Sequence, residues 1–443
     1  MEELLQGLGR AMARLAPGPP HDLRRLTGGA TMESWRFSAG GADFVLRRAP
    51  SMAFMEGRPF GHDTEAAVIR AAREAGVSAP EVVTVLADTD GIGSGFVMRA
   101  LPGTADPRAI QAMDDPATIL RQAAGDLARI HSLGRADLPP DVPVLDPADG
   151  VAGLRQQFRE AGGDRPIIAL GLRWLADNLP PPVEPVLNHG DYRLGNVLCE
   201  DSRLTGVLDW ELAHFGDPHE DLAFGCMAVW RFARYDRPAL GLGSLEDYFA
   251  AYEAESGRKV DPVRFRFWSV YRTVWWALGC LRQAQVWRDG ADRMLERVVI
   301  SRRTSENELD LLMLLEEDAP EAERALPVVL PDSSGERLGE ASQAELAGAV
   351  SEWLDTVKHK LAGHDRFQLA VARNALGMIA READLMPTER DLPLSEALLA
   401  GTESLQSSGL LADLRSRALR KLSADVPRYP ALAAARIKWT GED

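Results

Sequence analysis

The sequence is poor in cysteine and lacks a long uninterrupted hydrophobic run. Its three cysteines, Cys199, Cys226 and Cys280, include no C-x-x-C pair, which argues against a zinc site or a disulfide framework and indicates a reducing compartment. The most apolar long segment, residues 267–281, is interrupted by Arg272 and is shorter than the roughly 20 residues that a membrane helix needs. The first residues also lack the basic start and apolar run of a secretory signal. We therefore expect a cytoplasmic protein without a membrane partner.

Positive charge is also scarce. Lysine and arginine together number 50 against 66 aspartates and glutamates, which gives a formal net charge of −16. A chain with this charge is repelled by a phosphate backbone, so we expect no nucleic-acid partner. At roughly 150 residues per domain, a length of 443 residues predicts several structural units, and the 45% hydrophobic content suffices for packed cores.

Hydrophobic patterning divides the chain into three predicted domains. Residues 1–100 combine short strands with one helix and predict a small antiparallel α+β lobe. Residues 101–325 are mostly helical around a non-helical island at 186–217. Proline, serine and glycine mark a linker at 325–340, and residues 341–443 are helical almost throughout.

The first domain is predicted in more detail. A helix begins with Asp63 as its N-cap and ends at Ala75, before Gly76. Alternating apolar residues predict five strands around this helix, at residues 23–26, 35–39, 43–48, 81–88 and 93–100.

The non-helical island carries the residues with the clearest chemistry. It contains HGDYRLGN at residues 189–196 and VLDWE at residues 207–211. Phosphoryl transfer needs a carboxylate at the acceptor hydroxyl and oxygen ligands for Mg²⁺ on the nucleotide phosphates. Asp191, Asn196 and Asp209 supply these groups. The two short strands between the asparagine and the second aspartate predict a hairpin that brings these two residues together.

HGDYRLGN, VLDWE and the following GDPHEDLA together resemble the aminoglycoside phosphotransferase and choline kinase superfamily, whose members are related to protein kinases. The resemblance implies an α+β, two-lobed protein-kinase-like fold with a small antiparallel-sheet N-lobe, a mostly helical C-lobe and an added all-α C-terminal domain. It implies an ATP-dependent small-molecule kinase in which Asp191 is catalytic and Asn196 and Asp209 bind Mg²⁺. A protein kinase is a weaker match, because HGD replaces HRD, LDW replaces DFG and no APE-like segment follows.

The same resemblance points to nucleotide-binding residues in the first domain. LTGGATMESWRF resembles the loop over the phosphates, in which Gly28 and Gly29 let backbone N–H groups approach an anion. Thr31 and Ser34 would add hydroxyl donors. This loop is not a G-x-x-x-x-G-K-[ST] motif, so a P-loop nucleotidase is excluded at this position. An ordinary hairpin turn also explains the two glycines.

Two further segments of the first domain match the family pattern. In FVLRR, Arg47 stands where the family carries a phosphate-binding lysine, and arginine would hold phosphate with a different geometry and reach. Glu65 matches the acidic partner of that cation, although an exposed glutamate at a helix start would look the same. GFVMRALPG resembles the hinge facing adenine, with an extended backbone at Met98 and Arg99 and with Met98 against the ring. The same letters fit a strand that ends at Pro102.

Several residues near the motif are expected to have structural roles. His131 and His189 brace the catalytic loop, and Asp221 either does the same or lies on a solvated face. Asp217 caps the helix that follows, and Glu220 completes a capping box with it.

The phosphoryl acceptor is expected to be an alcohol group on a small molecule. Aminoglycosides are polycations that call for acidic pockets, whereas the predicted helix 262–288 has five arginines, many aromatic residues and no Asp or Glu. This helix is either an ordinary core helix or part of a pocket for an anionic acceptor with an apolar portion. The chain is most similar overall to the subgroup linked to acyl-CoA dehydrogenases, which implies a hydroxyacyl-CoA acceptor.

Other functions stay open at this point. The chain could be a nucleotide-binding pseudoenzyme or interaction module whose Arg47 has lost productive phosphate binding, or a true aminoglycoside or choline-type kinase. Residues 341–443 resemble a helical domain sometimes appended to these kinases, and packing, an acceptor lid or a homo-oligomer contact are its candidate roles. In its clearest helix, Asn374 is expected on a buried face with Phe367 and Met378.

Overall fold

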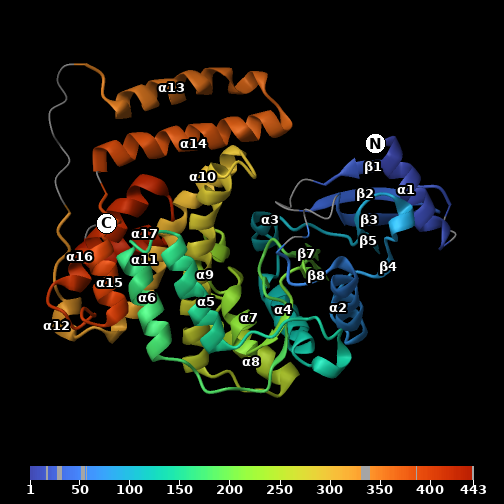
Figure 1. Cartoon of the computed structure of the whole chain (residues 1–443), viewed down its shortest axis with the longest axis horizontal. Helices are drawn as coiled ribbons and strands as arrows, with labels where there is room; N and C mark the ends of the chain where they lie inside the picture. Colours follow the sequence, from blue (N-terminus) through green and yellow to red (C-terminus); the bar gives the residue numbers. More distant parts are fainter. Residues whose placement is uncertain are drawn as a thin grey trace. The chain divides into compact units, whose positions relative to one another are not determined.

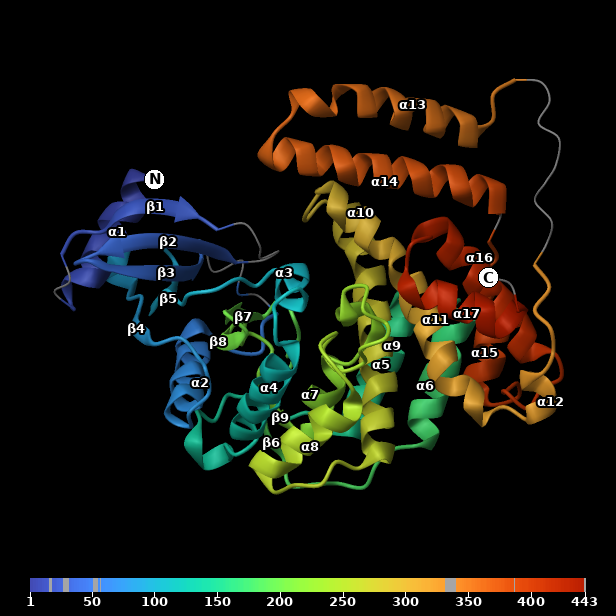
Figure 2. The same cartoon turned by 180° about the vertical axis from the view of Figure 1, so that it is seen from behind.

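The computed structural model describes most of the chain. The described residues are 1–15, 18–26, 32–50, 55, 57–330, 340–385 and 387–441. They form two compact units, and each is assembled from two segments: Met1–Asp146 with Pro181–Phe265, and Pro147–Pro180 with Arg266–Asp443. Figure 1 labels the helices and strands, and Figure 2 shows them from behind.

The first unit begins with a five-stranded antiparallel sheet in the order β1–β2–β3–β5–β4. Its strands are β1 (His21–Arg25), β2 (Glu33–Ala39), β3 (Ala42–Ala49), β4 (Val82–Val85) and β5 (Ser94–Arg99). Gly40 and Gly41, both at positive φ, form the tight turn from β2 to β3, and in the resulting register Ser34 lies opposite Arg47. The antiparallel lobe predicted from the sequence is confirmed.

One helix covers each face of this sheet. Neighbouring side chains of a strand point to opposite faces, so Phe96 and Val97 of β5 mark the two sides. Val97 packs in one cluster with Leu8 of α1 (Glu2–Ala13), whereas Phe96 packs in another with residues of α2 (His62–Glu74). The sheet is thereby fixed between two apolar layers.

The expected N-cap of α2 is wrong. The helix starts one residue before Asp63, and its N-cap is Gly61 in an extended conformation. Asp63 lies in the first turn instead, where a carboxylate interacts favourably with the free N–H groups of the helix start. The helix ends before Gly76, which has a positive φ as a residue after a helix end commonly does.

The rest of the first unit is mainly helical. Helices α4 and α8 pack together, and two small antiparallel sheets, β6 with β9 and β7 with β8, carry the motif segment. The bounds are α3 (Pro107–Gln111), α4 (Pro116–Ile130), β6 (Val186–Asn188), β7 (Val197–Glu200), β8 (Arg203–Val207), β9 (His214–Gly216), α7 (Pro218–Phe224) and α8 (Leu245–Ser256). Leu127, Tyr192 and Trp210 are buried in the same core as α2, which holds the motif segment against the first domain.

The described residues of the second unit contain helices and connecting segments but no strand. Helix α9 (Pro262–Arg288) begins in the first unit and continues into the second. The other helices are α5 (Pro147–Glu160), α6 (Pro166–Asp177), α10 (Leu295–Arg302), α11 (Thr304–Leu315), α12 (Glu321–Arg324), α13 (Gln343–Val357), α14 (Gly363–Leu385), α15 (Leu392–Ala400), α16 (Leu410–Asp425) and α17 (Pro430–Thr440). Helix α15 packs on α6, and α16 and α17 pack on α11. The unit therefore combines the predicted C-terminal domain with part of the segment 101–325.

Two observations concern the surface of these helices. No helix in the described part of the chain is both long and apolar enough to cross a membrane.

On α14, Met378 is buried, but Phe367 and Asn374 are exposed, so the expectation that Asn374 lies on a buried face is wrong. The neighbours of α14 leave the part around these two residues uncovered.

Candidate active site

The β7–β8 hairpin brings the asparagine and the second aspartate of the motif together, as predicted. Val197 pairs with Val207 in the antiparallel register. Beyond the end of this ladder, the backbone N–H of Leu208 donates to the carbonyl of Asn196 at 2.8 Å. Asp209 follows directly, with a positive φ of 68° that is unusual for a residue other than glycine. Such conformations cluster at functional sites, where the surrounding structure maintains them.

Asp191 is joined to the same hairpin by side-chain hydrogen bonds. The Asn196 Nδ2 donates to the Asp191 carboxylate at 2.6 Å and to the Asp191 carbonyl at 3.0 Å. The Arg193 guanidinium donates to both carboxylate oxygens, at 2.8 and 3.3 Å, and lies over the ring of Trp230 at 4.3 Å. Burial raises the pKa of Asp191, while Arg193 opposes this rise by favouring the charged form. The loop thus presents a buried carboxylate whose charge is balanced by one arginine.

The loop itself is anchored by Asp221 of α7. Its carboxylate accepts the backbone N–H groups of His189 at 2.5 Å and Gly190 at 2.8 Å. His131 lies behind it, 3.4 Å from the carboxylate through Nε2 and 2.8 Å from the hydroxyl of Tyr252 through Nδ1. Burial would raise the pKa of Asp221, but His131 and the loop N–H groups lower it to about 2. The bracing roles expected for His131, His189 and Asp221 are confirmed.

Two further features hold the loop in place. Gly190 has a φ of 82°, and a side chain there would lie 2.3 Å from the carbonyl oxygen of Leu212, so only glycine fits. Asp217 caps α7 by accepting the N–H of His219, as expected, and it also pairs with Arg264 at 2.7 Å. Glu220, expected to complete a capping box, contacts the His214 ring at 3.0 Å.

Arg47 of β3 lies among three carboxylates. Its guanidinium is 3.1 Å from Glu65, 2.7 Å from Asp209 and 2.6 Å from Glu211, with only 13% of the side chain exposed. The structure therefore brings together the two predicted partners Arg47 and Glu65, and it joins both to the end of β8. A second cation, Arg58, contacts Glu211 at 3.0 Å.

Burial and neighbouring charges shift the pKa values of the residues in this cluster. Burial raises the pKa of Glu65 to about 7. The attraction of Arg47 opposes this rise, and repulsion from the negative charges of Asp209 and Glu211 adds to it. Burial disfavours the charge of Arg47, but the three carboxylates outweigh it and raise its pKa above the ordinary value. Burial beside Arg47 and Arg58 lowers the pKa of His62 to about 4. The cluster has one carboxylate more than it has guanidinium groups.

Sequence reasoning missed three of these residues. Glu211 lies two residues after Asp209 in VLDWE, and this spacing, which places alternate side chains of an extended segment on one side, could have indicated it. Arg193 lies inside HGDYRLGN and could have been noticed as a cation next to the predicted base. Arg58 lies in an irregular segment without any periodic signal.

The structure describes only some of the remaining candidate nucleotide-binding residues, and these have different neighbours. Ser34 faces Arg47 across the β2–β3 ladder. Gly28, Gly29 and Thr31 lie outside the described residues. Met98 is half-buried against the core. Arg99 pairs with Glu81 at 2.8 Å and lies 5.5 Å from the Phe44 ring centroid. Its side chain therefore contacts residues in or next to the sheet.

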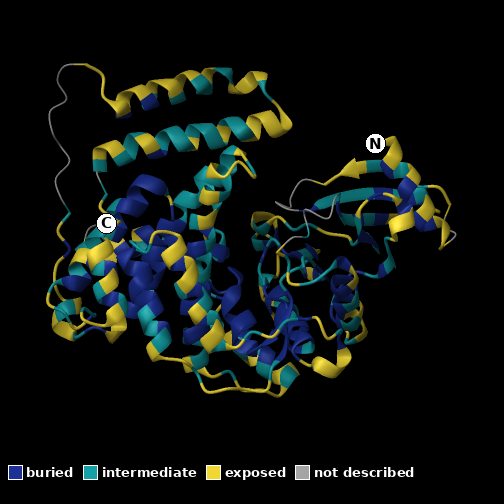
Figure 3. Cartoon of the chain, viewed as in Figure 1, coloured by how far each residue is buried: buried dark blue, intermediate teal, exposed yellow. Residues whose placement is uncertain are grey.

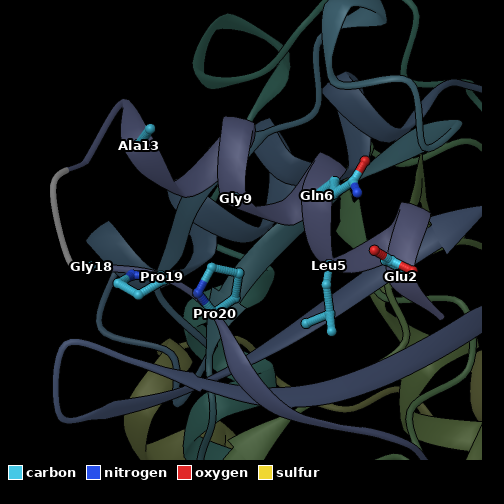
Figure 4. A pocket seen from close by; sticks show the side chains of 8 residues that line it. All are labelled: Glu2, Leu5, Gln6, Gly9, Ala13, Gly18, Pro19 and Pro20. Atoms are coloured by element: carbon cyan, nitrogen blue, oxygen red, sulfur yellow. The ribbon is translucent and has the colours of Figure 1, made fainter.

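A separate hollow of about 560 Å³ lies between α1 and the segment Gly18–Pro20. Figure 4 shows its lining, which consists of small, apolar and polar side chains such as Leu5 and Gln6. It shares no residue with the cluster around Asp191 and Arg47.

A family model described as the phosphotransferase enzyme family matches residues 22–260, which is more than half of the chain. The chain belongs to this phosphotransferase family. A crystal structure from Ralstonia eutropha, provisionally described as an aminoglycoside phosphotransferase, confirms the predicted fold. It aligns with 72% of this phosphotransferase and 98% of that chain at a TM-score of 0.58 and 20% identity.

Relatives of known name confirm the resemblance to the subgroup linked to acyl-CoA dehydrogenases. Acyl-CoA dehydrogenase family member 11 of Gallus gallus is 29% identical over 285 residues, and family member 10 of Mus musculus is 28% identical over 296 residues. These alignments cover 60% and 59% of this phosphotransferase but only 36% and 26% of the relatives. The chain thus spans about a third or less of the proteins that it matches.

The oxygen groups of this phosphotransferase fit a hard divalent cation. Among the described residues, no group of three or more His, Cys, Asp or Glu side chains forms a ready metal cage. The segment after β8 instead offers the carboxylates of Asp209 and Glu211, and the backbone of Asn196 is bonded to the residue before Asp209. Mg²⁺ commonly takes one or two carboxylates and completes its shell with water and phosphate oxygens, so this donor set suits it.

The arginines of α9 in this phosphotransferase are used in two ways. Arg264 pairs with Asp217, and Arg266 pairs with Asp318 at 3.0 Å. Arg272 is buried beside the Trp275 ring. Arg282 and Arg288 are exposed. Three arginines of the helix are therefore paired or buried, and the two near its end expose positive charge to solvent.

Proposed function

We propose that this phosphotransferase transfers the terminal phosphoryl group of ATP to an alcohol group on a small metabolite. The observation that carries the proposal is one connected polar cluster: Asn196 is bonded to Asp191 on one side and to the residue before Asp209 on the other. Arg47 then links Asp209 to the sheet. Phosphoryl transfer depends on this kind of positioning and charge stabilisation more than on covalent chemistry.

In this proposal Asp191 is the catalytic residue. Its carboxylate orients the acceptor hydroxyl and accepts its proton as the oxygen attacks phosphorus. Asn196 donates a hydrogen bond to one oxygen of this carboxylate. The positive charge of Arg193 favours the ionised form of Asp191 before substrate binds. The raised pKa of Asp191 makes it a stronger base than an exposed aspartate.

Asn196, Asp209 and Glu211 would hold Mg²⁺, which would offset the charge of the nucleotide phosphates. Arg47 contacts the α- and β-phosphates in the place of the family's lysine, and Glu65 fixes its guanidinium. Arg58 is a second phosphate ligand, since it already faces the same carboxylates.

The other nucleotide contacts follow the family pattern. In this proposal Gly28, Gly29, Thr31 and Ser34 would serve as phosphate-binding residues, and the backbone at Met98 and Arg99 would bind the adenine.

For the acceptor we propose a hydroxyacyl-CoA. The relatives carry names of acyl-CoA dehydrogenase family members. In the sequence, the five arginines of the segment 262–288 and its lack of Asp and Glu favour an anionic acceptor over a polycationic one.

ADP release measured with hydroxyacyl-CoA, aminoglycoside, choline and sugar acceptors tests the proposal. We expect turnover with hydroxyacyl-CoA and a loss of about 10²- to 10⁴-fold in Asp191→Asn, because the base is removed. Asp88→Asn, at an exposed aspartate of the same unit, is the matched control and should leave turnover unchanged. ATP binding without transfer to any acceptor would instead support a nucleotide-binding module. Turnover with polycations alone would overturn the acyl-CoA assignment.

A further inference from the structure

The arginine beside the proposed base also contacts a residue outside the catalytic loop. Besides its two bonds to the Asp191 carboxylate, Arg193 donates through Nη1 to the Leu194 carbonyl at 3.1 Å. The guanidinium carbon lies 4.3 Å from the centroid of the Trp230 ring, and only 20% of the Arg193 side chain is exposed. A guanidinium this close to an indole ring makes a cation–π contact, which burial strengthens.

The loop leaves room for this guanidinium at Gly195. A side chain at this position would lie 2.8 Å from Nη1 of Arg193, and the backbone φ of 98° also favours glycine. A larger residue would therefore displace the guanidinium from Asp191 or strain the backbone.

Trp230 is itself held in place. It lies in the short 3₁₀ helix Ala228–Arg231 and stacks on Phe224, with ring centroids 6.3 Å apart. Phe224 ends α7, which is buried along its whole length, as the dark blue ribbon in Figure 3 shows. The Arg231 guanidinium donates twice to the Cys226 carbonyl, at 2.9 and 2.8 Å. The indole ring is thus a fixed surface for the guanidinium that contacts it.

The two oxygens of Asp191 are used unequally. Oδ2 accepts from Asn196 at 2.6 Å and from Arg193 at 3.3 Å, whereas Oδ1 accepts only from Arg193, at 2.8 Å, among the described residues. A carboxylate oxygen accepts about two hydrogen bonds, so Oδ1 has room for one more donor.

We propose that Trp230 and Arg193 are a positioning pair, in which Trp230 fixes Arg193 and Arg193 turns Oδ1 of Asp191 toward the acceptor hydroxyl. This inference rests on the proposed function, because the group that the pair orients is the proposed base. Neither residue touches the reacting atoms. Their loss should therefore lower kcat and leave nucleotide affinity unchanged.

Chemical rescue tests the role of the guanidinium, with whichever acceptor of the panel the wild type phosphorylates. Arg193→Ala should lower kcat about 10- to 100-fold, since small misplacements of a reacting group are this costly. Guanidinium chloride at about 50 mM, far below denaturing concentrations, should raise this kcat at least fivefold, because the free ion can bind between ring and carboxylate. Methylammonium has the same charge without the planar fork and should not restore turnover.

Arg25→Ala is the matched control. Arg25 also lies over an indole ring, that of Trp35 at 6.0 Å, and faces Glu33 at 3.9 Å, but its side chain is 62% exposed and outside the loop. This variant should keep the wild-type kcat and should not respond to guanidinium. An equal response of both variants, or none in Arg193→Ala, would overturn the positioning role of Arg193.

Two substitutions separate the ring of Trp230 from its bulk. Trp230→Phe keeps an aromatic face and should retain most of kcat, whereas Trp230→Leu keeps only apolar volume and should lose about as much as Arg193→Ala. Guanidinium should no longer restore turnover when Arg193→Ala is combined with Trp230→Leu. Equal kcat in Trp230→Phe and Trp230→Leu would show that Trp230 only fills space.

A double-mutant cycle in urea tests the pair without turnover. The unfolding constant of Arg193→Ala/Trp230→Leu should differ about fivefold or more from the value that two independent effects predict. Additive effects would overturn the pair even in an active kinase. A coupled pair in a protein that phosphorylates no acceptor would instead overturn the proposed function and leave a structural contact only, so the two failures are distinguishable.

Discussion

The guanidinium of Arg47 lies 2.7 Å from the carboxylate of Asp209, although 162 residues separate them in the sequence. The contact joins β3, which is proposed to bind the nucleotide phosphates, to the end of the β7–β8 hairpin, which is proposed to bind the metal. A cation bound at Asp209 and phosphates bound at Arg47 therefore replace an interaction that the two residues make with each other. Nucleotide and metal binding should depend on one another for this reason.

Removal of the Arg47 charge should weaken nucleotide binding. We expect Arg47→Ala to bind a non-hydrolysable ATP analogue at least tenfold more weakly, which corresponds to about 1.4 kcal/mol. Arg47→Lys keeps the charge and should lose only part of this affinity, since lysine lacks the second guanidinium arm. Titration calorimetry in the presence of Mg²⁺ measures both. Arg36→Ala, at a partly exposed arginine of the same sheet that pairs with Asp43 instead of the cluster around Asp209, is the control. Equal affinity of Arg47→Ala and wild type would show that Arg47 does not contact the phosphates.

The buried carboxyl of Glu65 should make stability depend on pH. Its pKa is raised to about 7, above the value near 4.5 in an unfolded chain, so the folded protein holds a proton that the unfolded chain releases. The resulting contribution is present below about pH 4.5 and is lost as the pH rises through 7. Relative to Glu65→Gln, the wild type should therefore become less stable by up to about 3 kcal/mol between pH 5 and 8.

Urea unfolding of the two proteins across this pH range measures the difference. Glu74→Gln, at the exposed end of the same helix, should run parallel to the wild type. A constant difference between wild type and Glu65→Gln would mean that Arg47 keeps the carboxyl ionised throughout.

Asp221 should be required for both the stability and the geometry of the catalytic loop. In Asp221→Asn, an amide replaces one of the two oxygens that accept the N–H groups of His189 and Gly190, so one buried donor loses its acceptor. We expect a loss of about 2 to 4 kcal/mol in unfolding free energy. Turnover should fall more than nucleotide affinity, because the loop carries Asp191. Urea unfolding and ADP release measure these two effects, and an unchanged midpoint would contradict the bracing role.

The convergence of Asp191, Asn196 and Asp209 could be predicted from the sequence because one short segment contains all three. The spacing in HGDYRLGN fixes Asp191 relative to Asn196, and a hairpin of two short strands returns the chain to Asp209. Local chain geometry alone therefore brings these groups together. The pair of Arg47 and Glu65 was predicted from the family resemblance, and the structure places the two side chains 3.1 Å apart.

Contacts between distant segments could not be predicted in this way. The contact of Arg58 with Glu211 spans 153 residues and begins in a segment without periodicity. Likewise, α15–α17 share a core with α6 and α11, but each helix shows only that it has an apolar face and not which partner covers it. The partner is decided by packing in three dimensions, for which a single sequence carries no local signal.

Glu316 provides a test of how firmly the last helices are held. Its buried carboxylate accepts hydrogen bonds from Arg415 of α16 at 2.6 Å and from the Trp439 indole of α17 at 2.7 Å, and both partners are themselves buried. Glu316→Gln keeps the size of the side chain but leaves the Arg415 guanidinium buried without its counter-ion. Such a charge is costly, so we expect about 3 to 5 kcal/mol less stability in urea unfolding. Glu317→Gln, at the exposed neighbouring residue, should unfold like the wild type. If Glu316→Gln also unfolds like the wild type, apolar packing between α11 and α16 alone must hold the C-terminal helices, because the ion pair would then contribute nothing to their attachment.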